Sequence, residues 1–510
     1  MARIDETKNE LPLGIGKFGL GFMISAACLL SVIGFGIFAY YQQLTHGLIV
    51  TGLRTIGSGG ASWGLYVAFD VVFVGVSFAG ITIASLIRLL GIKDLKPIAR
   101  IAELLTITSL LMGALVILAD LGRPLDGLLK LPRLARPMSP FFGTFTMVIG
   151  GYLFASMVYF YLAGRSDAFY CAARAKRFAW VYRIWASGFK GTPAEYRRHH
   201  DVSYWMSLFI LPLLVTAHST LGFIFGIQAG RPGWFSTLQA PGFVVMAGIS
   251  GIGMLIVITA IIRKTLHLED TISEHAFRWL GNFVWILVLV YLYFIIAEEL
   301  TISYAGGTKE REYTNALMFG PYAHLFWTAI GSLVLTFAIL FIQFARGKVS
   351  IGWSVAAGLI VNVAAVLKRY LLVVPSQTHG MLIDYPPGKY SPSWVEISVI
   401  LGLVALATFL YVLFVKVFPI VPVSEHEISE TNPGVRSPRQ GLRVALTAFC
   451  LLGGISLAVF GFAISARAFT KPYADPIIPF SPVLFIVGLM MTFYSGAVYE
   501  TLPPEKGPPS

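Results

Sequence analysis

Four carboxylates lie inside or at the ends of long apolar segments. Asp70 interrupts the segment GLYVAFDVVFVG, Glu103 and Asp120 lie near the two ends of the apolar run 101–120, and Glu298 ends a later run. An ionised side chain in hydrocarbon costs about 2.5–3.5 kcal/mol on insertion scales, so each one needs a partner or a function. Because a positioned carboxylate can accept and release protons, these four are candidates for proton-coupled chemistry within a membrane.

Two histidines and two arginines occupy comparable positions. His218 and His324 lie within or at the start of apolar segments, Arg123 follows Asp120, and Arg369 lies near the end of another segment. Structural roles explain each residue equally well: Arg123 can pair with Asp120 at a helix end, His218 can bond to a neighbouring carbonyl, and Arg369 can reach water with its long side chain. Both a structural role and a role in proton-coupled chemistry therefore stay open for these residues.

The segments that carry these residues are expected to be membrane-spanning helices. Of the 510 residues, 56% are hydrophobic and only 13% are charged, and the mean hydropathy is +0.74. A soluble protein has about 25% charged residues, so an ordinary soluble enzyme is excluded. A span needs about 20 apolar residues. Ten segments qualify and two more follow them: 18–43, 62–90, 101–120, 140–163, 203–226, 240–262, 279–303, 322–344, 351–374, 394–418, 442–466 and 477–498.

The sequence therefore predicts an all-α, multi-pass membrane protein with about 10–12 spans, in two halves that resemble four-helix bundles plus peripheral helices. The expected regions are an N-terminal segment with the first span (1–60), a first bundle (61–230), a second bundle (231–420) and a C-terminal extension with one or two spans (421–510). Loops on the N-terminal side carry about twice the Lys and Arg of the other side, which places the N-terminus in the cytoplasm. The net charge of +12 therefore points to lipid headgroups and not to nucleic acid.

This chain contains few residues that could ligate a redox cofactor. Cys28, Cys171 and Cys450 lie far apart without a CxxC spacing, so we expect no iron–sulfur cluster and no metal site built by this chain alone. His218 and His324 could ligate one haem b, which stays an alternative, but no helix carries two histidines at the spacing of a two-haem bundle.

Several motifs together resemble one family. The combination of DLGRP, R-x-M-S-P and PGW-x-ST is more specific than any fragment alone. The matching stretches are SWGLYVAF at 62–69, AELLTITSLLMGALVILADLGRP at 102–124, RPMSP at 136–140, HSTLGFIFGIQAGRPGWFSTLQAPGFVVMAGISG at 218–251, AEELTISYAGG at 297–307, GPYAHLFW at 320–327, KRYLLVVPS at 368–376 and YSPSWVEISV at 390–399. The chain resembles the polysulfide-reductase membrane-anchor family (NrfD/PsrC-like), most of all its long ten-span branch, found in alternative complex III and in sulfate-reducer transmembrane redox complexes.

This resemblance implies a non-autonomous subunit of a quinol-linked respiratory oxidoreductase in a bacterial or archaeal cytoplasmic (inner) membrane. It implies that the chain binds a quinone, menaquinone or ubiquinone, holds no haem or iron–sulfur cluster itself, and exchanges electrons with a ferredoxin-like iron–sulfur subunit. A molybdopterin subunit or a multihaem cytochrome c subunit would complete the complex. The alternative-complex-III branch often has His at the positions of Asp120 and Phe78, so that branch's proton path does not transfer directly.

The resemblance and the buried charges together assign roles as hypotheses. Acidic and histidine groups that take quinol protons are Asp120, His218 and Glu298. Groups that bind the quinone are Arg123, which orients its neighbour, and Asp70, His324 and Arg369. Groups that could form part of a proton route across the first bundle are Glu103, Asp70 and Asp120.

Two other classes of protein remain open. A secondary transporter is favoured by the number of spans and by a weak internal repeat, in which 65–126 aligns with 243–303 and Asp120 with Glu298. However, no pair of Gly/Pro-broken spans occurs at corresponding depths. A membrane anchor that binds no quinone is the other class.

Overall fold

The computed structural model describes residues 11, 15–53, 61–134, 146–175, 178–379, 390–423, 440–467 and 481–500. The RPMSP motif at 136–140 lies outside these residues. Within them the regular structure is helical throughout: α1 (Leu20–His46), η2 (Leu48–Val50), α2 (Leu65–Val76), α3 (Phe78–Leu89), η3 (Lys93–Ile98), α4 (Ala99–Asp120), α5 (Pro124–Leu134), α6 (Thr146–Arg174), α7 (Ala179–Trp185), α8 (Pro193–Gly226), α9 (Gln239–Thr265), α10 (Glu274–Ala305), α11 (Thr308–Met318), α12 (Ala323–Ala345), α13 (Ile351–Val373), α14 (Pro375–Thr378), α15 (Trp394–Val417), α16 (Gln440–Arg467) and α17 (Ser481–Glu500).

Ten of the described helical segments are long and apolar enough to cross a membrane. In this count α2 and α3 form one span, Leu65–Leu89. The ten include Val444–Gly461, in the expected span 442–466, but not the expected span 140–163, whose described part forms α6. The last predicted span corresponds to a shorter apolar helix, Val483–Tyr499, within α17. The predicted all-α, polytopic architecture is confirmed.

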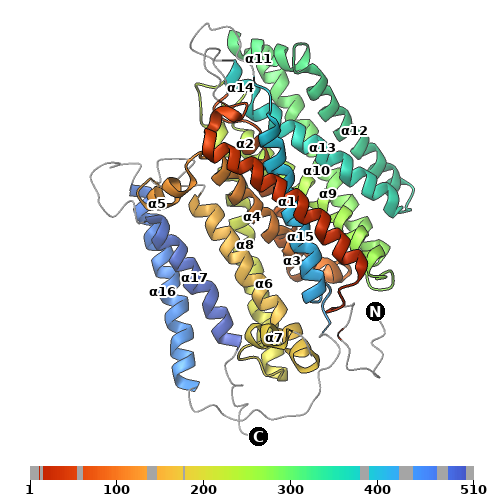
Figure 1. Ribbon diagram of the computed structural model, residues 1–510, viewed down its shortest axis with the longest axis vertical. Coiled ribbons are helices and arrows are strands. Elements are labelled where there is room, and N and C mark those ends of the chain that lie inside the picture. The colour runs from red at the N-terminus through yellow and green to blue at the C-terminus, as the bar shows by residue number, and fades with distance from the viewer. Residues whose placement is uncertain are drawn as a thin grey trace.

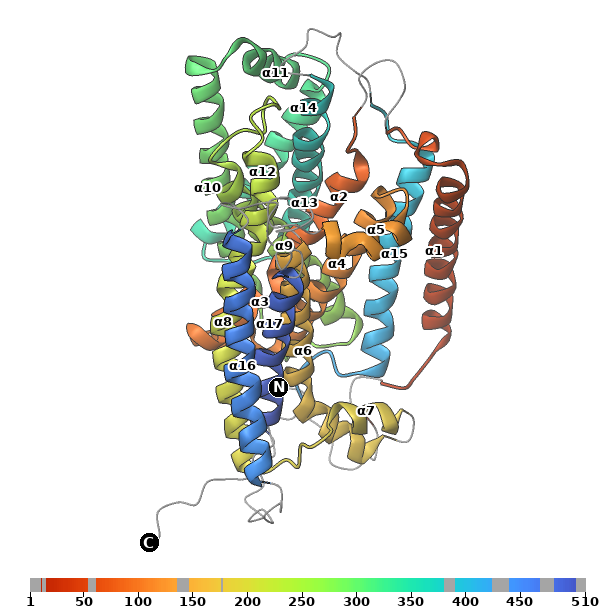
Figure 2. The same cartoon turned by 90° about the vertical axis from the view of Figure 1, so that its left-hand side faces the viewer.

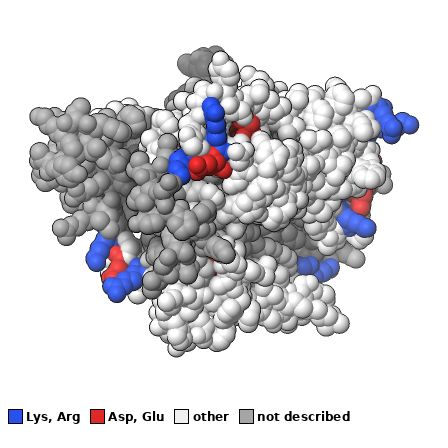
Figure 3. Space-filling view, turned by 90° about the horizontal axis from the view of Figure 1, so that it is seen from above, with Lys and Arg blue, Asp and Glu red and all other residues white. Residues whose placement is uncertain are grey.

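The long helices run side by side, with α11 and α14 together at one end, here called the α11 end (Figures 1 and 2). Helices α2, α3, α4, α6 and α8 form one packed group, and α9, α10, α12 and α13 form a second. Because α9 packs on members of both groups, buried residues of the two groups share one core. The boundaries expected at 230 and 420 stay predictions. Seen from the α11 end, charged side chains occur as a few separate groups among uncharged residues (Figure 3).

Two helix pairs lie outside these groups. α1 packs along α15, and the hairpin of α16 and α17 packs on α6 and α8 (Figures 1 and 2). The α1–α15 contact depends on glycine: a Cβ on Gly36 would lie 2.9 Å from the Cα of Gly402. Small residues let helix backbones approach closely in lipid, where packing drives association. This contact holds the end of α1 near α2 and α4.

The second span breaks between α2 and α3 at Ser77, and three other helices satisfy the backbone there. The His218 Nε2 lies 2.9 Å from the Val74 carbonyl oxygen. The hydroxyl groups of Thr106 and Tyr152 donate to the Ser77 carbonyl at 2.6 and 3.0 Å. A break at membrane depth is tolerated where side chains take up the freed backbone groups. The break therefore joins α2 and α3 to α4, α6 and α8 through polar contacts.

Candidate functional site

Two carboxylates from neighbouring helices lie close together inside the first group. Asp70 of α2 is 1% exposed and Asp120, the last residue of α4, is 6% exposed. The two carboxyl groups are near enough to repel each other when ionised. Among the described residues, neither carboxylate oxygen of Asp70 has a hydrogen-bond partner. Since buried polar groups are nearly always paired, Asp70 has acceptor capacity for a donor other than these residues.

Gly113 makes the room that the Asp70 side chain occupies. A Cβ on Gly113 would lie 3.3 Å from Oδ1 of Asp70 and 3.2 Å from Cγ2 of Val74. Both distances are short for a methyl group, so a side chain on α4 at this position would press on the carboxylate. The glycine therefore lets α2 present Asp70 directly to α4.

A short chain of hydrogen bonds links α1 to this carboxylate pair. The Tyr66 hydroxyl donates to Oε1 of Gln43 at 2.7 Å, and Nε2 of Gln43 donates to the carbonyl oxygen of Ala119 at 2.6 Å. Tyr66 is also close enough to Asp120 to interact with it electrostatically. Neither Gln43 nor Tyr66 was predicted from the sequence as a site residue. Gln43 could have been found as a polar residue ending an apolar span, whereas an aromatic residue such as Tyr66 carries no such signal.

A buried carboxylate closes the cluster on the side of α15. Glu396 accepts hydrogen bonds from the backbone N–H of Gly52 at 2.8 Å and of Ser393 at 3.0 Å, and from the Tyr390 hydroxyl at 2.6 Å. The Tyr390 oxygen in turn accepts from the backbone N–H of Leu65, at the start of α2. Burial, followed by the charge of Glu396, raises the pKa of Tyr390 well above its ordinary value, so the phenol stays a donor.

An apolar crevice of about 520 Å³ lies beside the Asp70 end of the carboxylate pair. Its walls come from α2, α4, α9, α13 and α15. Ile261 and Val404, which line the crevice, are 58% and 42% exposed, so the crevice opens on the lateral surface of the helix bundle. Phe69 and Phe73 of α2, which flank Asp70, belong to its lining, as does Met112 next to Gly113. The Asp70 carboxyl group therefore lies directly behind the crevice wall.

A second polar cluster lies in the second group, around a cavity of about 60 Å³. Glu298 and Glu299 of α10 both lie near Lys368 of α13, and the positive charge of Lys368 attracts both carboxylates. The Arg369 guanidinium lies 3.9 Å from the centre of the Phe243 ring. This cluster therefore contains both signs of charge, and its cavity is about a ninth of the crevice volume.

Tyr313 of α11 covers this second cluster. Burial, followed by the nearby charges of Glu298 and Glu299, raises the pKa of Tyr313 well above its ordinary value. The phenol therefore stays protonated, and it donates a hydrogen bond to the Leu371 carbonyl at 3.1 Å.

His218 lies between the clusters, with both ring nitrogens near backbone carbonyl oxygens. Its Nδ1 lies 2.8 Å from the Leu214 carbonyl oxygen and its Nε2 2.9 Å from that of Val74. A carbonyl can only accept and a neutral imidazole has one N–H, so the neutral ring donates to one of these two carbonyls, and the tautomer decides which. The structure therefore gives His218 a part in the α2–α3 break, and Arg369 lies near enough to interact with it electrostatically.

Glu103 lies apart from the carboxylate pair, at the opposite end of α4. It is buried, and Arg88, Arg100 and His199 are near enough to attract it. The direct partner of Arg100 is Asp167, at 2.6 Å. Glu103 is therefore surrounded by positive groups, but another carboxylate takes the short ion pair with Arg100.

Two further candidate residues face outward. The Arg123 side chain is 88% exposed and lies 4.0 Å from Asp126. His324, near the start of α12, is exposed. The structure thus brings Asp70 and Asp120 together, places Glu298 and Arg369 in a second cluster, and keeps Glu103, Arg123 and His324 away from both.

The fold and these buried polar clusters define a multi-pass integral membrane protein, and comparison with known proteins gives its family. Residues 55–380 match the polysulphide reductase NrfD family, and the chain belongs to it. The match contains Asp70, Asp120, His218 and Glu298 but not Gln43 or Glu396.

Similar proteins match this sequence along most of its length, in keeping with the family assignment. A protein of Halobacterium salinarum described as a membrane subunit of dimethyl sulfoxide reductase is 28% identical over 85% of this chain and 99% of its own length. The Hdr-like menaquinol oxidoreductase integral membrane subunit of Archaeoglobus fulgidus is 23% identical over 77% of this chain and 92% of its own. The menaquinone reductase integral membrane subunit of Nitratidesulfovibrio vulgaris is 22% identical over 79% and 92%.

Proposed function

We propose that this chain binds a quinone and handles its protons as the membrane subunit of a respiratory oxidoreductase complex. One observation carries the proposal: Asp70, which forms a buried carboxylate pair with Asp120, lies directly behind an apolar crevice that opens on the lateral surface of the helix bundle. The names of two relatives, a menaquinol oxidoreductase subunit and a menaquinone reductase subunit, support a quinone as the ligand.

The chemistry of a quinol matches this arrangement. Oxidation of a quinol releases two electrons and two protons, so the site needs an apolar slot, a hydrogen-bond partner for a ring oxygen and a proton acceptor. Asp70, whose oxygens have no partner among the described residues, would accept a quinol hydroxyl proton. Asp120 would take part as its neighbour, while Tyr66 and Gln43 hold the end of α4 in place.

Electrons would pass directly to an iron–sulfur cluster of a ferredoxin-like partner subunit. A molybdopterin or multihaem cytochrome c subunit would complete the complex, in keeping with relatives named as reductase and oxidoreductase subunits. The Lys and Arg distribution supports a cytoplasmic N-terminus in a bacterial or archaeal cytoplasmic membrane.

Proton movement across the first group is a second part of the proposal. Between Glu103 and Asp70 lie the hydroxyl groups of Thr106 and Tyr152, which meet at the Ser77 carbonyl. These groups support a route along α4 and the α2–α3 break. In liposomes, a Glu103→Gln complex should oxidise quinol with no pH change inside, and the exposed Glu269→Gln variant should behave like the unchanged complex. A pH change that persists in Glu103→Gln would exclude this route.

The central test is photolabelling with an azido-quinone in the assembled complex. Label should appear on α2 and α4 among the residues that line the crevice, such as Phe73 and Met112. Asp120→Asn should lower quinol oxidation by about 10²-fold or more, the usual size of a lost acid–base group. Asp126→Asn is the matched control, because Asp126 is half-exposed and lies six residues further along the chain. Unchanged oxidation in Asp120→Asn would remove Asp120 from the mechanism, and label confined to other helices would refute the site.

A further inference from the structure

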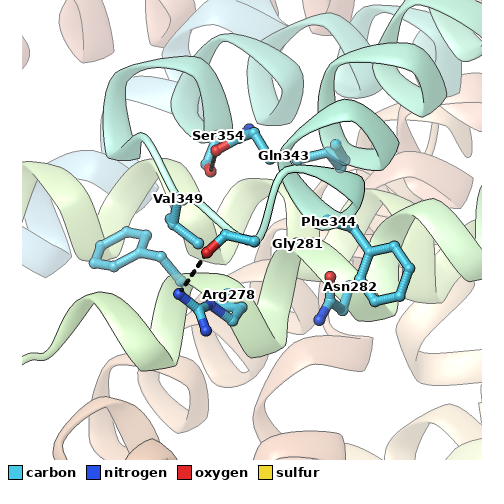
Figure 4. Close-up of a pocket in the computed structure, with 10 residues that line it drawn as sticks. Arg278, Gly281, Asn282, Gln343, Phe344, Val349 and Ser354 are labelled. Atoms are coloured by element: carbon cyan, nitrogen blue, oxygen red, sulfur yellow. Dashed lines mark hydrogen bonds between the residues drawn. The ribbon is translucent and has the colours of Figure 1, made fainter.

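A separate pocket lies at the corner where α10 begins, α12 ends and α13 begins (Figure 4). Its volume is about 160 Å³. Three of its lining residues carry N–H donors, Arg278, Asn282 and Gln343, and Phe344 forms part of its apolar wall. The pocket lies at the opposite ends of α10 and α13 from Glu298 and Lys368, so it is independent of the proposed quinone site.

The orientation of the Gln343 amide is determined by its neighbours. Oε1 accepts hydrogen bonds from the backbone N–H of Ser350 at 2.7 Å and from the Ser354 hydroxyl at 3.5 Å. Since a backbone N–H can only donate, the oxygen must face it, and the NH₂ group takes the other position. Within the described part of the chain this Nε2 has no hydrogen-bond partner, although it is shielded from water.

The Asn282 amide is oriented in the same way. The indole N–H of Trp285 donates to Oδ1 of Asn282 at 3.3 Å, and an indole nitrogen is a donor only. The oxygen of Asn282 is therefore occupied, and its NH₂ group has no partner among the described residues.

Arg278 adds the positive charge. One of its five N–H groups donates to the Gly347 carbonyl at 3.2 Å, which is the contact drawn in Figure 4. In the described ranges it has no ion-pair partner. Arg346 and Lys348 lie in the connection beside Gly347. The pocket therefore offers unused donors on three side chains, while the amide oxygens are taken, and this combination fits an anion.

An aromatic strip continues from the pocket along α10 and α12. The ring centre of Trp285 lies 5.3 Å from that of Phe344 and 5.5 Å from that of Phe341. The ring centres of Phe341 and Phe337 are 5.3 Å apart. Phe337 and Phe344 are seven residues apart, which is about two helical turns. Phe344 and Phe341 are exposed. A pocket with unused donors at the end of two spans thus leads into an apolar surface along those spans.

We propose that this corner binds an anionic phospholipid, with the phosphate in the pocket and an acyl chain along the aromatic strip. The guanidinium and the Asn282 NH₂ group would donate to phosphate oxygens, and the Gln343 NH₂ group would join them after a small shift of the side chains that shield it. Arg346 and Lys348 would add attraction at longer range. Basic pockets between spans at a membrane surface are suited to such headgroups. Bound lipid would join α10 to the α12–α13 connection.

Lipid titration of the purified, delipidated full chain tests this proposal. Native mass spectrometry would count bound phosphatidylglycerol and phosphatidylcholine of equal acyl length, and thermal unfolding would be followed with each lipid and with inorganic phosphate. The first phosphatidylglycerol should bind about tenfold or more tightly than phosphatidylcholine, because the choline cation cancels the net charge of the headgroup and is repelled by Arg278, Arg346 and Lys348. It should also raise the unfolding temperature, whereas inorganic phosphate should not.

The Arg278→Gln and Gln343→Leu double variant should lose this preference. The matched control is Lys93→Gln, a change of an exposed cation in η3, which packs against α10, and it should keep the preference. Arg278→Lys, which keeps the charge but loses the planar fork, should show a severalfold weaker preference and serves if the double variant does not fold. Equal binding of both lipids, an unchanged preference in Arg278→Lys or in the folded double variant, or equal stabilisation by inorganic phosphate would each overturn the proposal.

Discussion

The two polar clusters on either side of α9 occupy related places in the sequence but differ in charge and space. Asp120 and Glu298 align in the weak internal repeat, and both end long apolar segments. Around Asp120 a second carboxylate, Asp70, adds a like charge, and a crevice of about 520 Å³ adjoins Asp70. Around Glu298 the charge of Lys368 is opposite and the cavity holds about 60 Å³.

This difference indicates which cluster is suited to ligand chemistry. In the second cluster the opposite charge of Lys368 offsets the repulsion among the carboxylates around Glu298. In the first cluster the like charges of Asp70 and Asp120, with unused acceptor capacity at Asp70, favour a proton or a donor from outside. We therefore expect variants of the first cluster to change activity and variants of the second to change stability.

The largest effect is expected for Asp70→Asn. The amide keeps the size of the side chain but cannot take a proton, so quinol oxidation by the assembled complex should fall by about 10²–10⁴-fold. Glu298→Gln, the aligned change in the second cluster, should leave the rate within a few-fold. Steady-state quinol oxidation at saturating quinol checks this, and equal losses in the two variants would contradict the division of roles.

The next effect is expected for Lys368→Met. Removing the ammonium leaves Glu298 and Glu299 without their nearest attractive charge, and because these groups are only partly buried we expect a loss of about 1–3 kcal/mol in unfolding free energy. Chemical denaturation in detergent checks this loss. Lys264→Met, an exposed change at the end of α9, is the control, and a similar loss in both would mean that the cluster gives no special stabilisation.

A smaller effect is expected for Gly113→Ala. The added methyl group would lie 3.3 Å from the Asp70 carboxylate, so we expect a cost of about 1–2 kcal/mol together with slower quinol oxidation. Gly331→Ala in α12 is the control, because a Cβ there meets nothing within 4 Å. Thermal unfolding and turnover would be measured together, and parallel behaviour of the two variants would argue against contact between Gly113 and Asp70.

The smallest effect is expected from filling the crevice. Ala407→Phe places a ring among the α15 lining residues and should raise the KM for quinol by about fivefold with kcat nearly unchanged, as expected for lost binding worth about 1 kcal/mol. Val334→Phe, an exposed change on α12, should leave both constants unchanged. A lower kcat with an unchanged KM would indicate that the crevice does not admit the quinone.

The fold was largely predictable from the sequence, and the site was predictable only in part. Apolar segment length predicted the helices, because every backbone polar group in lipid must be paired within a span. Asp70 and Asp120 were recognisable because each is a charge in an apolar segment. Arg123, three residues after Asp120, was expected to orient it, yet it faces outward: Gly122 has φ +70°, and the chain turns there into α5. The assignment of its role stays a prediction.

Composition and hydropathy by themselves determined that this chain is a helical membrane protein with a few costly charges, since the price of polar groups in hydrocarbon depends on residue type and not on neighbours. Tertiary packing alone decided what each charge faces. The approach of α1 to α15 at Gly36 brings Gln43 to the end of α4, and the break at Ser77 engages His218 with backbone carbonyls. These partners are distant in sequence, and only the packing of helices sets their separation.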